Sequence, residues 1–429
     1  MKVSRRTSYM ISGWIETAHL TAGDGGTACL TIGCPDDFYA VRLGFPNISS
    51  QAWRLSKVIG CAADSFNDFV RPSTDCKWIP FKQGKSGSEP TLNVDGAGTD
   101  EIVVGPRLNP DTTDVAWTWT DWAPIASGPA SANDGLRVLF LRGLVPSGQT
   151  ISYAAGQMRA VLGNTAVNNG FETFIGGIKF DFDRVNDLIS EEPRLAWLEN
   201  QLVTGSVFPI VQFLTRSGGL TGLVVGDSHQ QGTSTTEQFT GFAYRAVTKA
   251  MWNHLGSIPL GLVNAAVGGL TSAQSFRRML ELIDEVQPAY AILPGWSYND
   301  EVNGVRAGRT AMEQLFARLL MAIEHCEARG VQPVILTPFP RDADSMGPEQ
   351  TEPWRWLRSE ILEMARRGAT VIDATALLGQ PSLEGFDATY RSDFTTDQMH
   401  PDDAGHSALG DLLVTLLEAV CRTPGRGNP

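Results

Sequence analysis

The chain has 429 residues, more than one hydrophobic core usually supports, so two domains are expected. Hydrophobic residues make up 42% of the chain and charged residues 19%, as in globular proteins with a sizeable core, and no apolar run is long enough to span a bilayer. The formal net charge of −13 argues against nucleic acid as a partner, because binding to a phosphate backbone needs clustered Lys and Arg.

The first 20 residues begin with basic side chains, but Ser12, Gly13 and Glu16 interrupt any apolar segment, so no signal peptide is predicted. A protein whose leader had been removed would show the same sequence, so the cytoplasm is only slightly favoured over export. Four of the six cysteines lie between Cys29 and Cys76, without the spacing of a zinc site. We expect buried free thiols, with one or two disulfides in an exported protein as the alternative.

The first half of the chain has the sequence pattern of short β-strands. Runs rich in β-branched and aromatic residues are separated by Gly, Pro, Asn and Asp clusters, and no long amphipathic helix precedes about residue 185. The predicted strands are 38–45, 101–105, 114–122 and 136–144. This pattern predicts an all-β sandwich or jelly-roll domain over residues 1–215.

From about residue 220 onward, strand-like and helix-like segments alternate. The predicted strands are 222–226, 258–264, 289–295, 333–339 and 370–374, and the predicted helices are 236–256, 273–286, 309–330, 352–368 and 401–420. Such alternation predicts a parallel sheet with helices on both faces, a three-layer α/β/α fold of the flavodoxin-like kind. We therefore place a second domain at residues 216–429, with the segment 187–217 as the join.

Ser228 follows the first of these predicted strands, in the sequence Gly226-Asp227-Ser228-His229. The carboxyl ends of the strands are where the active site of a parallel α/β sheet lies. Gly226 permits a tight turn, and a helix is predicted to begin near Glu237. Taken alone, a Gly-Asp-Ser turn is more often an ordinary turn than a nucleophile, because turns are rich in these residues.

Asp397 and His400 lie three residues apart before the last predicted helix. A nucleophilic serine needs an imidazole to take its proton and a carboxylate to fix the tautomer of that imidazole. A turn with this spacing can bring the carboxylate to Nδ1 and leave Nε2 facing the serine. Pro401 restricts the backbone of His400, which suits a fixed geometry.

Two further polar stretches follow predicted strands of the same sheet. Gly268 and Gly269 come after the strand 258–264, where a backbone N–H could point into the site. Asn299 follows the strand 289–295, where its side-chain amide could act as another donor. Together with Ser228, these groups are candidates for stabilising an oxyanion.

These four stretches resemble the four blocks of the SGNH (GDSL-type) hydrolases, and they occur in that family's order over about residues 220–420. The resemblance implies a serine esterase with Ser228 as nucleophile, His400 as general base and Asp397 as its orienter. It also implies an oxyanion hole formed by the Ser228 N–H, the Gly268 N–H and the Asn299 side chain, with Gly268 preferred to Gly269. The chain departs from the family pattern at Ser297, where the family usually has glycine.

Trp296 and His229 are the candidate substrate-binding residues, because Trp296 shares the loop of Asn299 and His229 adjoins Ser228. For His229 a bracing role is the alternative, since a side chain next to the nucleophile on one turn usually points away from the substrate. Neither a metal nor a cofactor is expected. No acidic or Cys partner stands at metal-ligand spacing from His19, His254 or His325.

Some other candidates have two interpretations each. Trp117, Trp119 and Trp122 fit either a core or a sugar-stacking platform. The loop 337–353 is long for a strand-to-helix connection and is either a substrate-binding lid or a plain connection. Surface exposure or packing is expected for His406, which lies at the start of the last predicted helix.

The pattern as a whole predicts an enzyme that hydrolyses O-acyl esters through an acyl-enzyme intermediate. An N-terminal β-domain before such a catalytic domain resembles the layout of carbohydrate esterases, so acetyl esters on carbohydrate are the preferred substrate. A short-chain esterase or thioesterase acting on small molecules is one alternative, and a catalytically inert glycan-binding protein is another.

Overall fold

The chain divides into two compact units, Arg5–Gly219 and Leu220–Pro429, the latter together with Met1–Ser4. The computed structural model describes residues 4–10, 15–19, 26–63, 77–84, 92, 98–107, 114–130, 137–155, 205–206, 209–236, 240–253, 260–302, 308–340, 348–382 and 385–421. No helix within these ranges is both long and apolar enough to cross a membrane.

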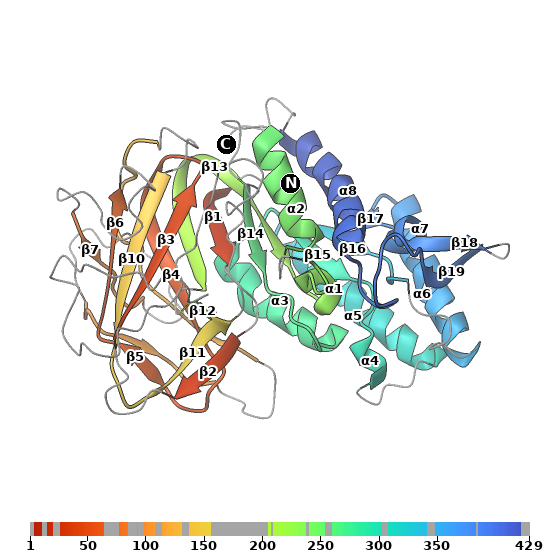
Figure 1. Ribbon diagram of the computed structural model, residues 1–429, viewed down its shortest axis with the longest axis horizontal. Helices are drawn as coiled ribbons and strands as arrows, with labels where there is room; N and C mark the ends of the chain where they lie inside the picture. The colour runs from red at the N-terminus through yellow and green to blue at the C-terminus, as the bar shows by residue number, and fades with distance from the viewer. Residues whose placement is uncertain are drawn as a thin grey trace. The chain divides into compact units, whose positions relative to one another are not determined.

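The N-terminal unit is built of strands, and its described residues include no helix. The strands are β1 (Ser4–Met10), β2 (Ile15–His19), β3 (Gly26–Cys34), β4 (Phe38–Asn47), β5 (Trp53–Leu55), β6 (Lys57–Ala63), β7 (Ile79–Pro80), β8 (Ile102–Val104), β9 (Ala116–Trp119), β10 (Arg137–Val145), β11 (Thr150–Ala155), β12 (Gly205–Ser206) and the first part of β13 (Ile210–Val224). The ladders are antiparallel, with the orders β3-β10-β6-β7, β12-β11-β2, β5-β8 and β9-β4-β13 (Figure 1). The four strands expected in this half are confirmed.

The tryptophan-rich strand β9 packs around a buried cation. Arg42 on β4 is 1% exposed, and its guanidinium lies 4.4 Å from the ring centre of Trp119 and 5.4 Å from that of Trp122. Trp122 is itself buried, and the Trp117 ring lies 6.2 Å from that of Trp119. Aromatic faces attract a guanidinium strongly once both are out of water. These contacts favour packing over a sugar-stacking platform.

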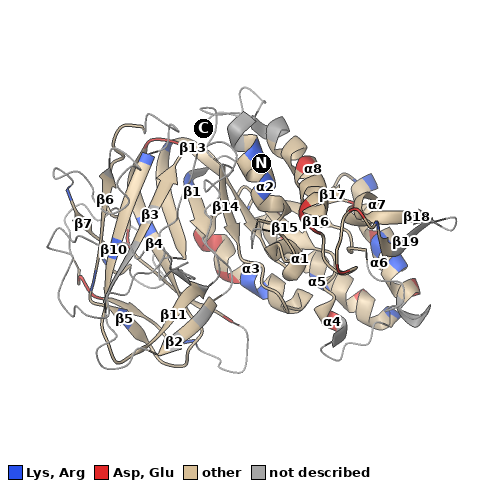
Figure 2. Ribbon diagram, in the orientation of Figure 1, with Lys and Arg blue, Asp and Glu red and all other residues tan. Residues whose placement is uncertain are grey.

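The second unit contains a parallel sheet in the order β14-β13-β15-β16-β17. Its strands are β14 (Leu260–Asn264), β15 (Tyr290–Pro294), β16 (Gln332–Leu336), β17 (Thr370–Ile372) and the last residues of β13. From Leu220 onward these strands carry no Lys, Arg, Asp or Glu, as Figure 2 shows, and most of their residues are buried. A parallel sheet covered on both faces requires such apolar strands.

Strand β13 is longer than expected. The sequence predicts only residues 222–226, whereas the strand runs over Ile210–Val224. Its first part pairs antiparallel with β4, and its last five residues pair parallel with β14. The two patterns meet near Gly218 and Gly219, just after the segment 187–217 that the sequence suggested as the join. The expected domain boundary at 215/216 therefore falls inside this strand.

Helices cover both faces of the parallel sheet (Figure 1). They are α1 (Ser228–Gln231), α2 (Phe242–Asn253), α3 (Ser272–Val286), α4 (Asn299–Val302), α5 (Arg309–Ala328), α6 (Pro348–Arg366), α7 (Ala374–Leu378) and α8 (Asp403–Cys421), and a hairpin of β18 (Gly379–Ser382) and β19 (Gly385–Tyr390) precedes α8. On one face α2 lies against α8, and on the other α5 contacts α3 and α6. Helix α3 begins at a capping box, in which Thr271 and Gln274 each satisfy the other's backbone N–H.

The predicted α/β fold of the second half is confirmed, with differences at element ends. The helix expected over 236–256 begins at Phe242, and α1 was not anticipated because four residues are too few to show a helical period. The expectations for His254, Cys76 and residues 341–347 lie outside the described ranges. The cysteines whose side chains the structure describes, Cys34, Cys61 and Cys326, are buried free thiols.

Candidate active site

Ser228 is the first residue of α1, four residues beyond the end of β13. Asp227 caps this short helix: its carboxylate accepts from the His229 N–H, while the Asp227 N–H donates to Gln230 Oε1. Gly226 has φ of +151°, and a Cβ there would lie 2.1 Å from Gln230 Oε1. Only glycine fits this turn, which leaves Ser228 half-buried at the end of the sheet.

The Ser228 hydroxyl faces His400 from a distant part of the chain. Ser228 Oγ lies 2.9 Å from His400 Nε2, and His400 Nδ1 lies 2.7 Å from Asp397 Oδ2. Because a carboxylate only accepts, His400 Nδ1 carries the proton, and the lone pair of Nε2 then accepts from the Ser228 hydroxyl. The structure thus brings together the three residues that the sequence singled out, in the order a serine nucleophile requires.

The loop 395–400 holds Asp397 in place by backbone contacts. Asp397 Oδ1 accepts from the N–H groups of Met399 at 2.8 Å and His400 at 2.7 Å. The Thr395 hydroxyl lies 2.7 Å from the His400 carbonyl oxygen. Partial burial raises the pKa of Asp397, but the hydrogen bonds from His400 and Met399 outweigh it and bring the pKa to about 2. This carboxylate is therefore ionised at neutral pH.

His400 is the group whose protonation would stop it from acting as a base. Burial lowers the pKa of His400, the nearby His229 lowers it further, and contact with Asp397 opposes both without cancelling them. The net direction is downward from the ordinary value. The imidazole is therefore neutral and ready to accept a proton around neutral pH.

Gly268 lies next to the nucleophile, as expected for an oxyanion donor. A Cβ at Gly268 would lie 3.7 Å from Ser228 Cβ, whereas one at Gly269 would meet no atom within 4 Å. The Gly268 N–H donates to Gln231 Oε1 at 2.8 Å. A substrate oxygen would have to replace this side-chain oxygen before the Gly268 N–H could serve it.

Asn299 is the first residue of α4, and its amide is held by neighbouring groups. Its Nδ2 lies 3.2 Å from both the Leu270 carbonyl oxygen and Ser297 Oγ. Ser297 Oγ lies 2.5 Å from Asp227 Oδ2, so this hydroxyl joins the loop of Asn299 to the loop of the nucleophile. The SGNH family usually has glycine at the position of Ser297, whereas here the Ser297 side chain bridges two loops.

Trp296 and His229, the candidate substrate-binding residues, are both only 6% exposed. His229 Nδ1 lies 2.9 Å from Asp227 Oδ1, and His229 Nε2 lies 2.8 Å from the Met399 carbonyl oxygen. With both ring nitrogens engaged, His229 has no donor or acceptor left for a substrate. Its placement fits the bracing role that was the alternative.

Some site residues carry no sequence signal. Gln231 and Thr395 touch the catalytic groups only through loops that the fold brings together, and nothing in the local sequence marks them. Ser297 could have been noticed, as a departure from the family pattern. His406 is fully buried on α8, where its Nδ1 accepts from the Phe242 N–H, so of the two expectations for it packing holds.

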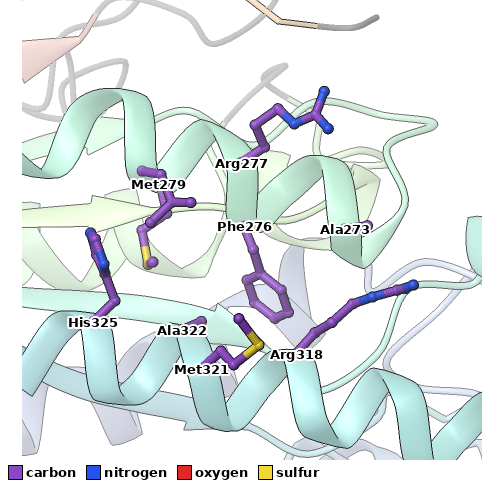
Figure 3. A pocket seen from close by; sticks show the side chains of 9 residues that line it. Ala273, Phe276, Arg277, Met279, Arg318, Met321, Ala322 and His325 are labelled. Atoms are coloured by element: carbon purple, nitrogen blue, oxygen red, sulfur yellow. The ribbon is translucent and has the colours of Figure 1, made fainter.

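A separate cavity of about 340 Å³ lies between α3 and α5 (Figure 3). Its lining includes Phe276, Met279 and Met321, with Arg318 at one end, and none of the candidate catalytic residues. Among the residues that the structure describes, no group of His, Cys, Asp and Glu is arranged to hold a metal ion.

Residues 224–408 match the model of the GDSL-like lipase/acylhydrolase family. They form a GDSL-like acylhydrolase domain. The GDSL-like domain contains β14 to β17 of the parallel sheet and every candidate catalytic residue, and it is that of a serine ester hydrolase. No curated protein matches the chain.

Solved structures of similar proteins align with about half of the chain. A lipase/acylhydrolase from Enterococcus faecalis is 16% identical, with 47% of this chain and 96% of that one covered and a TM-score of 0.37. The esterase EstA from Pseudoalteromonas sp. is 16% identical, with 47% and 99% covered and a TM-score of 0.35. A GDSL-like lipase from Bacteroides thetaiotaomicron is 14% identical, with 47% and 88% covered and a TM-score of 0.36.

Proposed function

We propose that the GDSL-like domain hydrolyses acyl esters with Ser228 as nucleophile, His400 as general base and Asp397 as the group that orients His400. The observation that supports this is the unbroken chain of contacts from Ser228 Oγ through both ring nitrogens of His400 to Asp397, at 2.9 and 2.7 Å. Such a chain delivers the serine proton to a neutral imidazole and stabilises the imidazolium that forms.

The reaction proceeds in two halves. Ser228 Oγ bonds to the ester carbonyl carbon while its proton moves to His400 Nε2; the alkoxy C–O bond then breaks, and His400 returns the proton to the leaving alcohol. Water next attacks the acyl-enzyme, giving a proton to His400 Nε2; the acyl bond to Ser228 Oγ then breaks, His400 returns that proton to Ser228 Oγ, and the acid is released. Each half passes through an oxyanion.

Three donors are proposed for that oxyanion: the Ser228 N–H, the Gly268 N–H and the Asn299 amide. The last two are engaged by Gln231 and by Leu270 in the structure. A developing negative charge accepts more strongly than a neutral amide or peptide oxygen, so it would draw both donors away from these partners in the transition state.

For the substrate, we propose O-acetyl esters on carbohydrate. The support is the layout: a strand-rich unit precedes the GDSL-like domain, as in carbohydrate esterases. We propose residues 1–215 as an accessory domain that affects substrate choice and residues 216–429 as the catalytic domain. Ester or thioester substrates of small molecules, and glycan binding without hydrolysis, are the other outcomes of the test below.

Hydrolysis of p-nitrophenyl esters of increasing acyl length, acetylated xylan and acetylated monosaccharides tests this function, with acetate or p-nitrophenol release as readouts. We expect acetate release from the carbohydrate esters and the fastest p-nitrophenyl turnover with acetate. A preference for longer acyl chains with no acetate release would move the assignment to small-molecule acyl esters. The rate of Ser228→Ala on each substrate gives the background hydrolysis that is subtracted.

A further inference from the structure

His229 occupies the place of the leucine in the Gly-Asp-Ser-Leu motif for which the GDSL family is named. A titratable ring thus stands where an aliphatic side chain is usual, directly after the nucleophile. It is buried, and it packs at a tilt of 40° against the Phe339 ring at 4.7 Å and the His400 ring at 5.2 Å between centroids. A buried polar ring must have its hydrogen-bonding groups satisfied by the protein.

The partners of His229 decide how many protons it carries. Nε2 faces the Met399 carbonyl oxygen, which has no proton to give. Nδ1 faces Asp227 Oδ1, which already accepts from the His229 N–H, while Asp227 Oδ2 receives the Ser297 hydroxyl. Both ring nitrogens therefore meet acceptors. Only the imidazolium form donates from both nitrogens, since a neutral ring would leave one of these contacts without a proton.

The carboxylate of Asp227 balances that charge. Burial lowers the pKa of His229, but the charge of Asp227 and its hydrogen bond outweigh burial, so the net direction is upward. Burial raises the pKa of Asp227, but the charge and hydrogen bonds of His229 bring it below its usual range. The two groups form a buried ion pair, a charged arrangement that persists only with close contact and additional hydrogen bonds.

We propose that His229 is a positioning residue, kept as an imidazolium, that fixes the Met399 carbonyl and thereby the adjoining His400, and whose charge extends catalysis to lower pH. The proposal rests on the proposed roles of Ser228 and His400. The charge of His229 lowers the pKa of His400, and the smaller opposing effect of Asp227 does not cancel it. His400 therefore remains a free base in more acidic solution than an ordinary histidine would.

Titratable groups on neighbouring elements also surround this pair. Asp227 belongs to the turn of His229, and Asp397 and His400 belong to the loop before α8. Tyr390 on β19 feels the charges of Asp227 and Asp397, and burial raises its pKa well above the usual value, so it stays neutral. His406 on α8, whose pKa burial lowers to about 3, is neutral as well. No second cation among these groups would replace the charge of His229.

The first experiment measures the charge directly, without activity. In protein labelled with 15N-histidine, the His229 signals, assigned by their loss in His229→Gln, should show two protonated ring nitrogens at pH 7.5. His19→Gln serves as the control for assignment, since His19 is exposed on β2, where its Nδ1 lies 3.1 Å from Thr150 Oγ1. A neutral His229 ring at pH 7.5 would overturn the proposal, whether or not the protein hydrolyses esters.

The second experiment measures the pH dependence of kcat/KM for p-nitrophenyl acetate in the wild-type protein, His229→Gln and His19→Gln. Glutamine removes the charge and retains an amide that can donate to Met399 or Asp227. We expect the acid-side midpoint to rise by about one pH unit in His229→Gln and to stay unchanged in His19→Gln. A lower kcat with an unmoved midpoint would mean packing alone and would contradict the proposal.

The two proposals fail in different ways. If Ser228→Ala retains wild-type turnover, the proposed function is wrong, while the NMR result on His229 still stands. If Ser228 is essential but the midpoint of His229→Gln does not move, the function stands and the inference about His229 is wrong. Should His229→Gln fail to fold, His229→Asn, a shorter neutral amide, takes its place in the pH profile.

Discussion

The hydroxyl of Ser297 lies 2.5 Å from Asp227 Oδ2, so a side chain that the family pattern does not call for joins two loops of the active site. Both residues are buried, at 0% and 1% exposure. Ser297 Oγ also lies 3.2 Å from the Asn299 backbone N–H and from its Nδ2. The position of the proposed oxyanion donor thus depends on the same hydroxyl that contacts the cap of α1.

Ser297→Ala should therefore destabilise the protein and lower activity moderately. Leaving a buried carboxylate without one of its donors costs about 1–3 kcal/mol. Urea unfolding should show this loss, while Ser359→Ala, at an exposed position of α6, should leave the free energy of unfolding nearly unchanged. Equal stability of the two variants would show that the Ser297 bridge contributes nothing.

Asp397→Asn and His400→Ala should both reduce kcat severely, for different reasons. Alanine removes the base, whereas asparagine leaves a ring that is no longer held in the tautomer with Nδ1 protonated. In triads on other folds the equivalent amide change costs about 10⁴-fold in kcat. Steady-state kinetics on p-nitrophenyl acetate checks both variants, and a loss below tenfold in Asp397→Asn would argue against the assigned orienting role.

Asn299→Ala tests whether the amide serves the oxyanion or only braces its loop. A donor used in the transition state should lower kcat by about 10²–10³ with KM little changed. A loop brace would instead lower the melting temperature and leave kcat largely intact. Measuring both quantities on one preparation separates the roles.

Stability in mild acid should depend on His406. Burial, followed by the charge of Arg245, lowers the pKa of His406 to about 3, whereas in the unfolded chain it is near 6.5. Between these values the unfolded chain binds a proton that the folded protein does not, so the contribution of His406 is complete above about pH 6.5 and is lost as the pH falls toward 3.

The melting temperature of the wild-type protein should accordingly fall between pH 7.5 and 5, and that of His406→Asn should fall less. Asparagine has an acceptor for the Phe242 N–H that His406 Nδ1 now binds. His19→Asn, at an exposed site, should follow the wild-type slope. Parallel slopes for the wild-type protein and His406→Asn would show that His406 protonation does not limit stability in this range.

Much of the second unit was predictable because its strands are continuous apolar runs and its helices have clear starts, such as the capping box at Thr271. The position of Ser228 at the carboxyl end of a parallel strand was predictable from the strand order. Its partner His400, 172 residues away, was predictable from its spacing to Asp397 and from the resemblance to the SGNH hydrolases. The contact of Gln231 with Gly268 could not be predicted, since it depends on how two loops meet. The contacts of the two His229 ring nitrogens could not be predicted for the same reason.

The N-terminal part of β13 shows a different limit. Local propensity at Gly218 and Gly219 predicts that a strand ends there. The strand continues because its backbone pairs with β4 before these glycines and with β14 after them. His406 shows a third limit of prediction from sequence. A single histidine near the start of α8 gives no sign of whether it faces solvent or α2.

The account depends most on Ser228 as the nucleophile, and active-site labelling tests this directly. A fluorophosphonate probe should phosphonylate the protein once, and peptide mass mapping should place the label on Ser228. Ser228→Ala should take no label and show no ester hydrolysis, while its melting temperature stays close to that of the wild-type protein, because the half-buried hydroxyl contributes little packing. Labelling at another serine, or wild-type turnover by folded Ser228→Ala, would contradict the mechanism.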